Sequence, residues 1–338
     1  ADKFEGTEEA VEALRIAALF RQGLGQLAEA ERNARRYLKL VGKKDPAKAA
    51  EIFFSLGKIF EKSEDWDKVI RHYQEFLRDY RDSGKVDLLL EAHTRIGNAY
   101  MAQKRPDERK AQAAYKASYD AFKALTPKQV EELTTGRSAV AEARFKMGEA
   151  IFTQLKSSPL KVRSLSNLKK YVAEMADAIK AKTEIAANAR TIFLEVIEFK
   201  SANWAIAALA RIGQIFENLS DEIYNLPAPK TFDEEQVETF KGEMANRAEA
   251  PRGKAKEAYE LCLGKARELK WFNQWSDVAE RRLAELMPDK YRYNAEVRAR
   301  PTFFGPDIVG QRFIKALDEV EEDPADAKAA GDLEEGGQ

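Results

Sequence analysis

Cysteine is nearly missing from this sequence, since Cys262 is the only one among 338 residues. A single cysteine excludes an intrachain disulfide and a zinc site built from several thiolates. Histidine is almost as rare, and nothing in the sequence pairs His72 or His93 with a nucleophile. The 18 glycines and 11 prolines are too few for a turn-rich β architecture, which favours helices throughout.

Long apolar runs and phosphate-binding loops are missing as well. No stretch of 18 apolar residues occurs, so we expect no membrane-spanning segment. The start at Ala1 shows no charged, apolar, small-residue leader, and we expect a chain that is not a secretory precursor. Gly23-Leu24-Gly25 lacks both the third glycine and the preceding strand of a phosphate loop. We therefore expect no nucleotide, no other cofactor and no metal ion.

Charge is nearly balanced over the whole chain, with a formal net charge of −1, but it is unevenly distributed. Residues 318–338 are rich in Asp and Glu and contain Lys328 as their only base, which leaves the rest of the chain mildly basic. This distribution suits an acidic protein partner, or a tail that screens its own groove, better than nucleic acid, for which no motif is present. We expect residues 318–338 to be disordered.

What the sequence does contain is a recurring phrase, Ala-x-x-x-apolar-Gly-x-x-apolar, of which only the first copy lacks the alanine. The glycines of its four copies are Gly57, Gly97, Gly148 and Gly213. A glycine inside a helix costs about 1 kcal/mol relative to alanine, so four of them among good helix formers predict close helix contact at each site. The phrase thus predicts stacked helical hairpins, which offer a partner a groove without specifying any chemistry.

Apolar residues at helical spacing predict helices along most of the chain. The clearest hairpin pairs residues 46–62 with 65–80, while 160–200 indicates either one long helix or two medium ones interrupted near 179–183. A strong helix is expected to begin at Pro251. We divide the chain into a repeat array (1–225), an irregular surface excursion (226–250), capping helices with an extended aromatic and basic segment (251–317), and an acidic tail (318–338).

The hairpin at 46–80 carries a specific pattern: Leu56-Gly57-x-x-Phe60, then Asp65-Trp66-x-x-Val69-x-x-x-Tyr73-x-x-Phe76-Leu77. This pattern resembles the tetratricopeptide repeat, and the other three copies keep only its first-helix phrase. The resemblance implies an all-α fold, a tetratricopeptide-like α-α superhelix of irregular helical hairpins. It also implies a scaffold that binds proteins without catalysis.

The resemblance further implies a concave groove lined by first-helix residues around each glycine. Those residues are Phe54, Lys58, Glu61, Thr94, Arg95, Asn98, Met101, Phe145, Glu149, Phe152, Ala210, Gln214 and Glu217. Part of the family grips a peptide carboxylate with Lys and Asn at such positions. We expect no such clamp, because Lys58 stands where Asn is needed and because Phe54 and Glu149 oppose the pattern. Each residue alone is also compatible with a solvated helix face.

Residues 258–283 are similar to the end of tetratricopeptide-repeat proteins from the cell envelope of myxobacteria and their relatives, among them lipoproteins of the adventurous gliding machinery. This resemblance implies a periplasmic or outer-membrane-associated scaffold. The alternative is a cytoplasmic regulator that senses a peptide in the same groove. Such sensors usually carry a DNA-binding helix-turn-helix, and none precedes Glu9.

A candidate second surface lies toward the C-terminus and comprises Trp271, Trp275, Tyr291, Tyr293, Arg298, Phe303 and Phe304. The two tryptophans are spaced one helical turn apart, which suits a capping helix that seals the last repeat as well as an interface hot spot. The aromatic and basic segment 291–306 is compatible both with folding back along the array and with binding a partner.

Catalysis has little support in the sequence. Cys262 lies among Tyr and Leu residues and is predicted to be a small buried hydrophobe. His93, one turn before Gly97, is predicted to be a packed helix residue. An enzyme would need His72 or His93 to converge with carboxylates in a pocket, and no local pattern enforces that.

Overall fold

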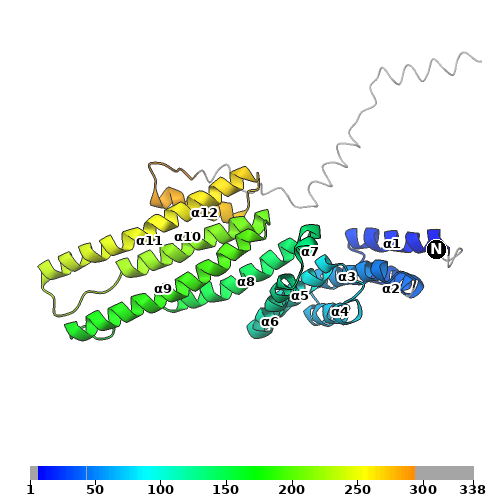
Figure 1. The fold of residues 1–338 in the computed structure, drawn as a ribbon, viewed down its shortest axis with the longest axis horizontal. Helices are drawn as coiled ribbons and strands as arrows, with labels where there is room; N and C mark the ends of the chain where they lie inside the picture. Colours follow the sequence, from blue (N-terminus) through cyan, green and yellow to red (C-terminus); the bar gives the residue numbers. More distant parts are fainter. Residues whose placement is uncertain (1–6, 43, 294–338) are drawn as a thin grey trace, which may run out of the picture. The chain divides into compact units, whose positions relative to one another are not determined.

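The computed structural model describes residues 7–42 and 44–293, and every element in this part is a helix or an irregular connection. Figure 1 shows the helices following one another in chain order. Their bounds are α1 (Glu8–Gly23), α2 (Leu27–Val41), α3 (Pro46–Lys62), α4 (Trp66–Asp79), α5 (Val86–Ala102), α6 (Glu108–Lys123), α7 (Pro127–Glu132), α8 (Gly136–Ser157), α9 (Leu168–Glu198), α10 (Ala202–Tyr224), α11 (Glu234–Glu268) and α12 (Gln274–Leu286).

The helix starts follow directly from local chemistry. The helices α3, α4 and α6 are each capped by an aspartate side chain that accepts a hydrogen bond from a backbone N–H group in the first turn. The capping residues are Asp45, Asp65 and Asp107, respectively. Such caps satisfy amides that have no partner within the helix. Pro46 and Pro127 occupy the first turn of α3 and α7, where the missing N–H costs nothing. The sequence therefore specifies where these helices begin.

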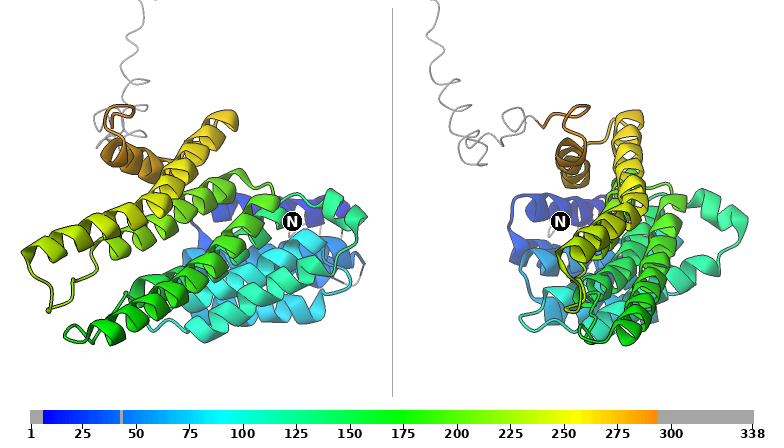
Figure 2. Two further views of the ribbon diagram at one scale, coloured as in Figure 1. Left: turned by 60° about the vertical axis from the view of Figure 1, so that its left-hand side comes forward. Right: turned by 90° about the vertical axis from the view of Figure 1, so that its left-hand side faces the viewer.

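The helices pair as hairpins, in which we call the first helix the A helix and the second the B helix. The pairs are α1/α2, α3/α4, α5/α6, α8/α9 and α10/α11, with the short α7 between the third and fourth, and α12 packing on α10 and α11. Successive A helices also contact one another from α3 to α10, and α12 continues this row by contacting α10. Figure 2 shows α10 running alongside both α9 and α11. The all-α prediction of stacked hairpins is thus confirmed for the described residues.

Each glycine of the recurring phrase lies against an aromatic ring of the following B helix. A Cβ atom at Gly57, Gly97, Gly148 or Gly213 would approach the ring closer than 3.0 Å. The facing rings are Tyr73, Tyr115, Phe193 and Tyr259. Real Cβ atoms do not tolerate that distance, so only glycine lets the ring fill the space between the two helices. The predicted close helix contact is confirmed at all four sites.

Helix α9 is a single helix without an interruption near 179–183, and a buried lysine explains part of its path. Lys182 is 2% exposed and donates hydrogen bonds to the carbonyls of Leu155 (2.9 Å) and Ser158 (3.0 Å). It also forms an ion pair with Glu222 of α10. A cation at the C-terminal end of α8 satisfies carbonyls that the helix itself leaves open. The lysine therefore ties the end of α8 to α9 and α10.

The prediction for residues 226–250 is wrong from Glu234 onward. An irregular segment does follow α10, but α11 begins after Asp233, which caps it together with Gln236. The helix then continues through Pro251 instead of starting there. Proline removes one helical hydrogen bond and its ring crowds the carbonyl four residues before it. The burial of Met244 and Ala248 before Pro251, and of Tyr259 after it, offsets that cost.

Candidate functional site

The predicted groove residues lie on four successive A helices, α3, α5, α8 and α10, and the structure divides them into two groups. Phe54, Thr94, Phe145 and Phe152 are buried, with exposed fractions of 2%, 2%, 1% and 8%. These side chains belong to the core and present little surface to a partner, as does Ala210. The prediction had treated both sides of each glycine as groove lining. In the structure, the apolar residues on this side pack within their hairpin, as Phe54 does on Tyr73, and also on the next hairpin, as Phe145 does on Trp204.

The polar group forms a continuous set of bridges between neighbouring A helices, which we call the polar row. Its contacts are Arg95 with Glu61, Asn98 with Glu142 (2.9 Å), Arg211 with Glu149 (2.6 Å) and Arg282 with Glu217 (2.9 Å). Lys58 lies 4.0 Å from Glu91 and is 44% exposed, and Met101 is 40% exposed. The predicted polar residues of the groove therefore do lie in one row. Most of their charged groups, however, already form ion pairs or hydrogen bonds with other residues of this chain.

Two tyrosines link the polar row to the glycine contacts. The hydroxyl of Tyr115 donates to Asn98 (2.9 Å), and the hydroxyl of Tyr259 donates to Glu217 (2.7 Å). Burial raises the pKa of both tyrosines, so both keep their protons. Burial also raises the pKa of Glu142, although the hydrogen bond from Asn98 acts in the opposite direction. The tyrosines that pack on Gly97 and Gly213 thus also form hydrogen bonds with members of the polar row.

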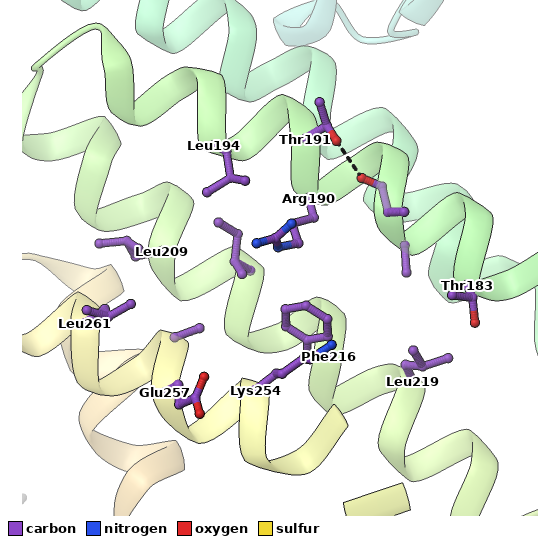
Figure 3. Close-up of a pocket in the computed structure, with 14 residues that line it drawn as sticks. Thr183, Arg190, Thr191, Leu194, Leu209, Phe216, Leu219, Lys254, Glu257 and Leu261 are labelled. Atoms are coloured by element: carbon purple, nitrogen blue, oxygen red, sulfur yellow. Dashed lines mark hydrogen bonds between the residues drawn. The ribbon is translucent and has the colours of Figure 1, made fainter. Parts of the chain in front are cut away.

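A second surface, absent from our sequence predictions, lies on the opposite side of α10. It is an apolar groove between α9 and α11 with α10 as its floor, formed by two adjoining hollows of about 480 and 790 Å³ (Figure 3). We call it the α9–α11 groove. Its main lining residues are Arg190, Leu194, Ile197, Leu209, Phe216, Leu219, Lys254, Glu257 and Leu261.

The α9–α11 groove combines exposed leucines with charged side chains of both signs. Leu194 is 38% exposed and Leu261 is 62% exposed. Figure 3 shows Arg190 of α9 and Lys254 of α11 approaching from opposite sides of Phe216. Neither forms an ion pair within 4.0 Å among the described residues, and Lys254 lies 5.6 Å from the centre of the Phe216 ring. Glu257, Glu260 and Glu268 also line the groove, so its charge is mixed. Such a surface favours a ligand that is apolar along one side and carries acidic groups where it meets Arg190 and Lys254.

The groove was not predicted from the sequence, because the apolar residues around Cys262, Leu261 among them, were all expected to face inward. In the structure Ala255, Tyr259, Cys262 and Ala266 form that buried side, and Leu261 projects away from it. The signal was present in the spacing, since Leu261 falls outside the pattern of positions three and four apart. A single leucine outside that pattern is common on helical surfaces, however, and indicates nothing until a neighbouring hollow is known.

The candidate second surface at the C-terminus is only partly covered by the described residues. Trp275 packs on Phe145, with ring centres 5.4 Å apart, and its ring lies 4.7 Å from the Arg211 guanidinium. It therefore seals the core, whereas Trp271 lies before α12 and is 50% exposed. Tyr291 donates to Glu260 (2.8 Å). Tyr293 is the last described residue, and Arg298, Phe303 and Phe304 lie outside the described residues, as do the segment 294–317 and the acidic tail.

His72, His93 and Cys262, which the sequence offers as candidates for catalysis, are packed against other residues of the core. His72 stacks on Phe53 with ring centres 4.2 Å apart, its Nε2 lies 2.7 Å from the Phe53 carbonyl, and burial lowers its pKa to about 4. Burial also lowers the pKa of His93 and raises the pKa of the Cys262 thiol to about 12. A neutral thiol and a neutral, buried imidazole are poorly suited to nucleophilic or acid–base work.

Metal-binding groups and membrane-spanning helices can be assessed for residues 7–42 and 44–293. Within them, no three or more His, Cys, Asp or Glu side chains are arranged to hold a metal ion. None of the helices in this part of the chain combines the length and the apolar character needed to cross a membrane.

The alternation of A and B helices, the A-to-A contacts and the ring against each glycine define a tetratricopeptide-like fold. The sequence itself matches no protein-family model and no curated protein. Among solved structures, a TPR repeats protein from Bacteroides fragilis is 13% identical, with a TM-score of 0.37, over 81% of this chain and 98% of that one. A computationally designed self-assembling cyclic homooligomer is 16% identical, with a TM-score of 0.25, over 84% and 99%.

Proposed function

We propose that this protein is a non-enzymatic scaffold that binds an amphipathic helix of a protein partner in the α9–α11 groove. The observation that carries this proposal is that exposed Leu261 and Leu194 lie beside Arg190 and Lys254, neither of which forms an ion pair with another described residue. A helix with an apolar stripe would cover the leucines, and acidic residues on its flank would pair with the cations. The preformed groove would lower the cost of ordering on binding.

The A-helix side is the second candidate surface for a partner segment, as the sequence resemblance implies. Lys58 and Met101 are the predicted residues that remain most exposed there. A partner on this side would have to contact side chains of the polar row that already have partners within the chain. We therefore place it second to the α9–α11 groove.

Chemical crosslinking distinguishes the two surfaces, because each is flanked by its own lysines. We would capture partners from extracts with the intact protein, apply an amine-reactive crosslinker and map the sites by mass spectrometry. Crosslinks at Lys254 and Lys265 are expected, together with loss of capture by Leu261→Glu. The matched control is Phe272→Glu, which replaces a similarly exposed side chain elsewhere. Crosslinks confined to Lys58 and Lys146 would move the site to the A helices.

The location in a bacterial envelope complex, including a gliding-type machinery, remains a proposal supported only by the similarity of residues 258–283. Its alternative is a cytoplasmic peptide-sensing regulator. Separate envelope and cytosolic extracts of the source organism test the two. Partners retained from the envelope extract and lost with Leu261→Glu support the envelope proposal, whereas partners from the cytosolic extract alone support the regulator.

A further inference from the structure

The α9–α11 groove carries open charges of both signs, in a definite order along α11. Lys254 comes first, with Arg190 of α9 across the groove, and Glu257 follows one turn later (Figure 3). None of these three forms an ion pair with another described residue. A bound segment therefore meets open cations at one end of the groove and an open carboxylate one turn further along.

The other charged groups of the groove already have partners. Lys265 and Glu268 pair with each other at 2.8 Å. Glu260 pairs with Lys290 at 2.6 Å and accepts a hydrogen bond from Tyr291 at 2.8 Å. These contacts fix where the described chain ends. The residues that follow Tyr291 are attached beside Glu260, at the end of the groove away from the open cations.

Residues 308–322, which we call the C-terminal segment, have the sequence pattern of an amphipathic helix. Their apolar residues recur at helical spacing and would share one side of a helix: Val309, Phe313, Ala316, Leu317 and Val320. Asp307 stands just before the pattern and suits an N-cap. These residues lie outside the described part of the chain, and the pattern follows from their sequence alone. It supplies the apolar stripe that the exposed leucines of the groove favour.

The charges of the C-terminal segment are ordered as well. Its bases, Arg312 and Lys315, precede its acids, which all fall within 318–322. If the segment enters from the end where the described chain leaves, its basic half meets Glu257 and its acidic half meets Lys254. Both signs of charge are then matched in one direction, antiparallel to α11, whereas the reverse direction would oppose like charges.

The spacing of these charges agrees with that direction. Lys315 and Glu319 are four residues apart and would lie on one flank of a helix, about 6 Å apart along its axis. Glu257 and Lys254 are three residues apart on α11, about 4.5 Å along its axis. Both pairs therefore span about one helical turn, within the reach of long side chains.

The connection to the C-terminal segment is long enough. Residues 294–307 span up to about 46 Å when extended. The groove follows α11 from Lys254 to Glu268, which is about 21 Å. A tether of this kind gives a local concentration on the order of millimolar, so that a contact of modest affinity is sufficient.

We propose that the C-terminal segment forms a helix in the α9–α11 groove of its own chain, and that a protein partner binds by displacing it. The inference rests on the proposed function, because the segment and the partner compete for one groove. The intact groove is then partly closed, and charges placed on the apolar side of the segment open it.

A fluorescent peptide of residues 306–324 tests whether the groove is free, by anisotropy against the full chain. The intact protein should bind the peptide weakly, because its own segment competes. The variant Phe313→Glu/Leu317→Glu should bind it about tenfold or more tightly. The matched control is Ala329→Glu/Ala330→Glu, which adds the same charges beyond the segment and should bind like the intact protein. Equal binding by all three proteins, or none by any, overturns the inference.

The same peptide shows whether the binding surface is the groove. Adding Leu261→Glu to the Phe313→Glu/Leu317→Glu variant should abolish peptide binding, whereas adding Phe272→Glu should not. Both positions are more than half exposed, so these variants are expected to fold. Peptide binding that survives Leu261→Glu overturns the assignment to this groove.

A second copy of the chain is the other source of a competing segment, and sedimentation velocity separates the two. Docking within one chain predicts a monomer over a concentration series up to about 0.1 mM. Association that rises with concentration and is abolished by Phe313→Glu/Leu317→Glu would mean that the segment binds a neighbouring copy. That result overturns the inference.

A charge exchange tests the direction of the segment. In the Phe313→Glu/Leu317→Glu variant, Lys254→Glu should weaken peptide binding severalfold, and a peptide carrying Glu319→Lys should recover it. The coupling should decrease as salt rises. No recovery overturns the proposed antiparallel direction.

Partner capture distinguishes failure of this inference from failure of the proposed function. The Phe313→Glu/Leu317→Glu variant should capture more of a partner that depends on Leu261 than the intact protein does. Equal capture through Leu261 by both proteins would leave the proposed function standing and remove only this inference. Peptide binding through Leu261 without capture of any partner would support the segment in the groove and count against the scaffold.

Discussion

His72 shows how burial converts an ionisable residue into a structural one. Its Nε2–H donates to the Phe53 carbonyl while the ring stacks on Phe53, and the nearby charges of Glu31, Arg35 and Lys68 partly offset one another. Protonation would place a charge inside the hairpin α3/α4. Desolvation therefore dominates and holds the pKa of His72 at about 4, below its ordinary value of 6.5.

This lowered pKa predicts a pH dependence of stability. Between pH 6.5 and 4 the unfolded chain binds a proton at His72 and the folded chain does not, so the free energy of unfolding falls as the pH falls. From pH 6.5 to 5 the loss should be about 2 kcal/mol. Urea unfolding at both pH values measures it, and His72→Gln, which can still donate to the carbonyl, should show a smaller loss. An equal loss in both proteins would assign the effect to carboxylates.

Tyr73 and Tyr259 occupy equivalent positions against Gly57 and Gly213 but differ at their hydroxyls. The Tyr259 hydroxyl donates to Glu217 at 2.7 Å, whereas the Tyr73 hydroxyl faces the Glu61 carboxylate without a hydrogen bond of good geometry. Burial, and to a smaller extent this carboxylate, raises the pKa of Tyr73. Tyr259→Phe should therefore lower the free energy of unfolding by about 1 to 3 kcal/mol, and Tyr73→Phe should lower it by less, because the contact of its hydroxyl with Glu61 has poorer geometry. Denaturant midpoints of the two variants, compared at one pH, measure the difference. Equal destabilisation would contradict it.

At the scale of the element, a glycine inside a helix has opposite meanings depending on its neighbour. Gly97 lies against the Tyr115 ring, whereas Gly242 in α11 has no atom within 4 Å of the position a Cβ would occupy. The intrinsic helix preference for alanine is the same at both sites. Packing therefore decides the sign of the effect.

Alanine at these two positions tests that statement. Gly97→Ala should destabilise the protein by about 1 to 3 kcal/mol through overpacking, and Gly97→Leu should cost at least as much. Gly242→Ala should stabilise it by up to about 1 kcal/mol, because only helix propensity changes. Thermal unfolding by circular dichroism gives both values. An unchanged midpoint for Gly97→Ala would mean that the Tyr115 ring moves aside at no cost.

Much of the element scale was predictable, for identifiable reasons. The helix starts at Asp45 and Asp65 and the glycine contact at Gly57 depend on residues close in sequence, so local chemistry specifies them. The continuation of α11 through Pro251 was not predictable, because the penalty at proline is local whereas the burial that outweighs it comes from α10. The predicted polar residues were found, but their partners lie on neighbouring hairpins.

At the scale of the whole molecule, each bridge of the polar row links one hairpin to the next, so the row runs along the array. Arg211 pairs with Glu149 and lies over the rings of Phe152 (4.4 Å) and Trp275 (4.7 Å). In a repeat array, stability is close to a sum of units and their interfaces. Loss of one bridge should therefore act locally.

Arg211→Ala tests this locality by hydrogen exchange. The free energy of unfolding should fall by about 2 to 4 kcal/mol, because Glu149 would keep a half-buried charge without its partner. Amide protection should decrease in α8, α10 and α12 and stay unchanged in α1 to α4. Arg32→Ala, which removes a 69% exposed partner of Glu29, should change nothing measurable. Loss of protection along the entire chain would mean that the hairpins unfold as one unit.

The sequence by itself determined the helices, their capping residues and the positions where two helices must touch, because each depends on spacing within one or two adjacent elements. Only the tertiary structure decided which apolar side chains stay uncovered. Helical periodicity assigns Phe20 and Leu261 to a side of their helix, but whether a neighbour lies on that side depends on chain tens of residues away. The exposed leucines of the α9–α11 groove, and hence the proposed binding site, follow from that packing.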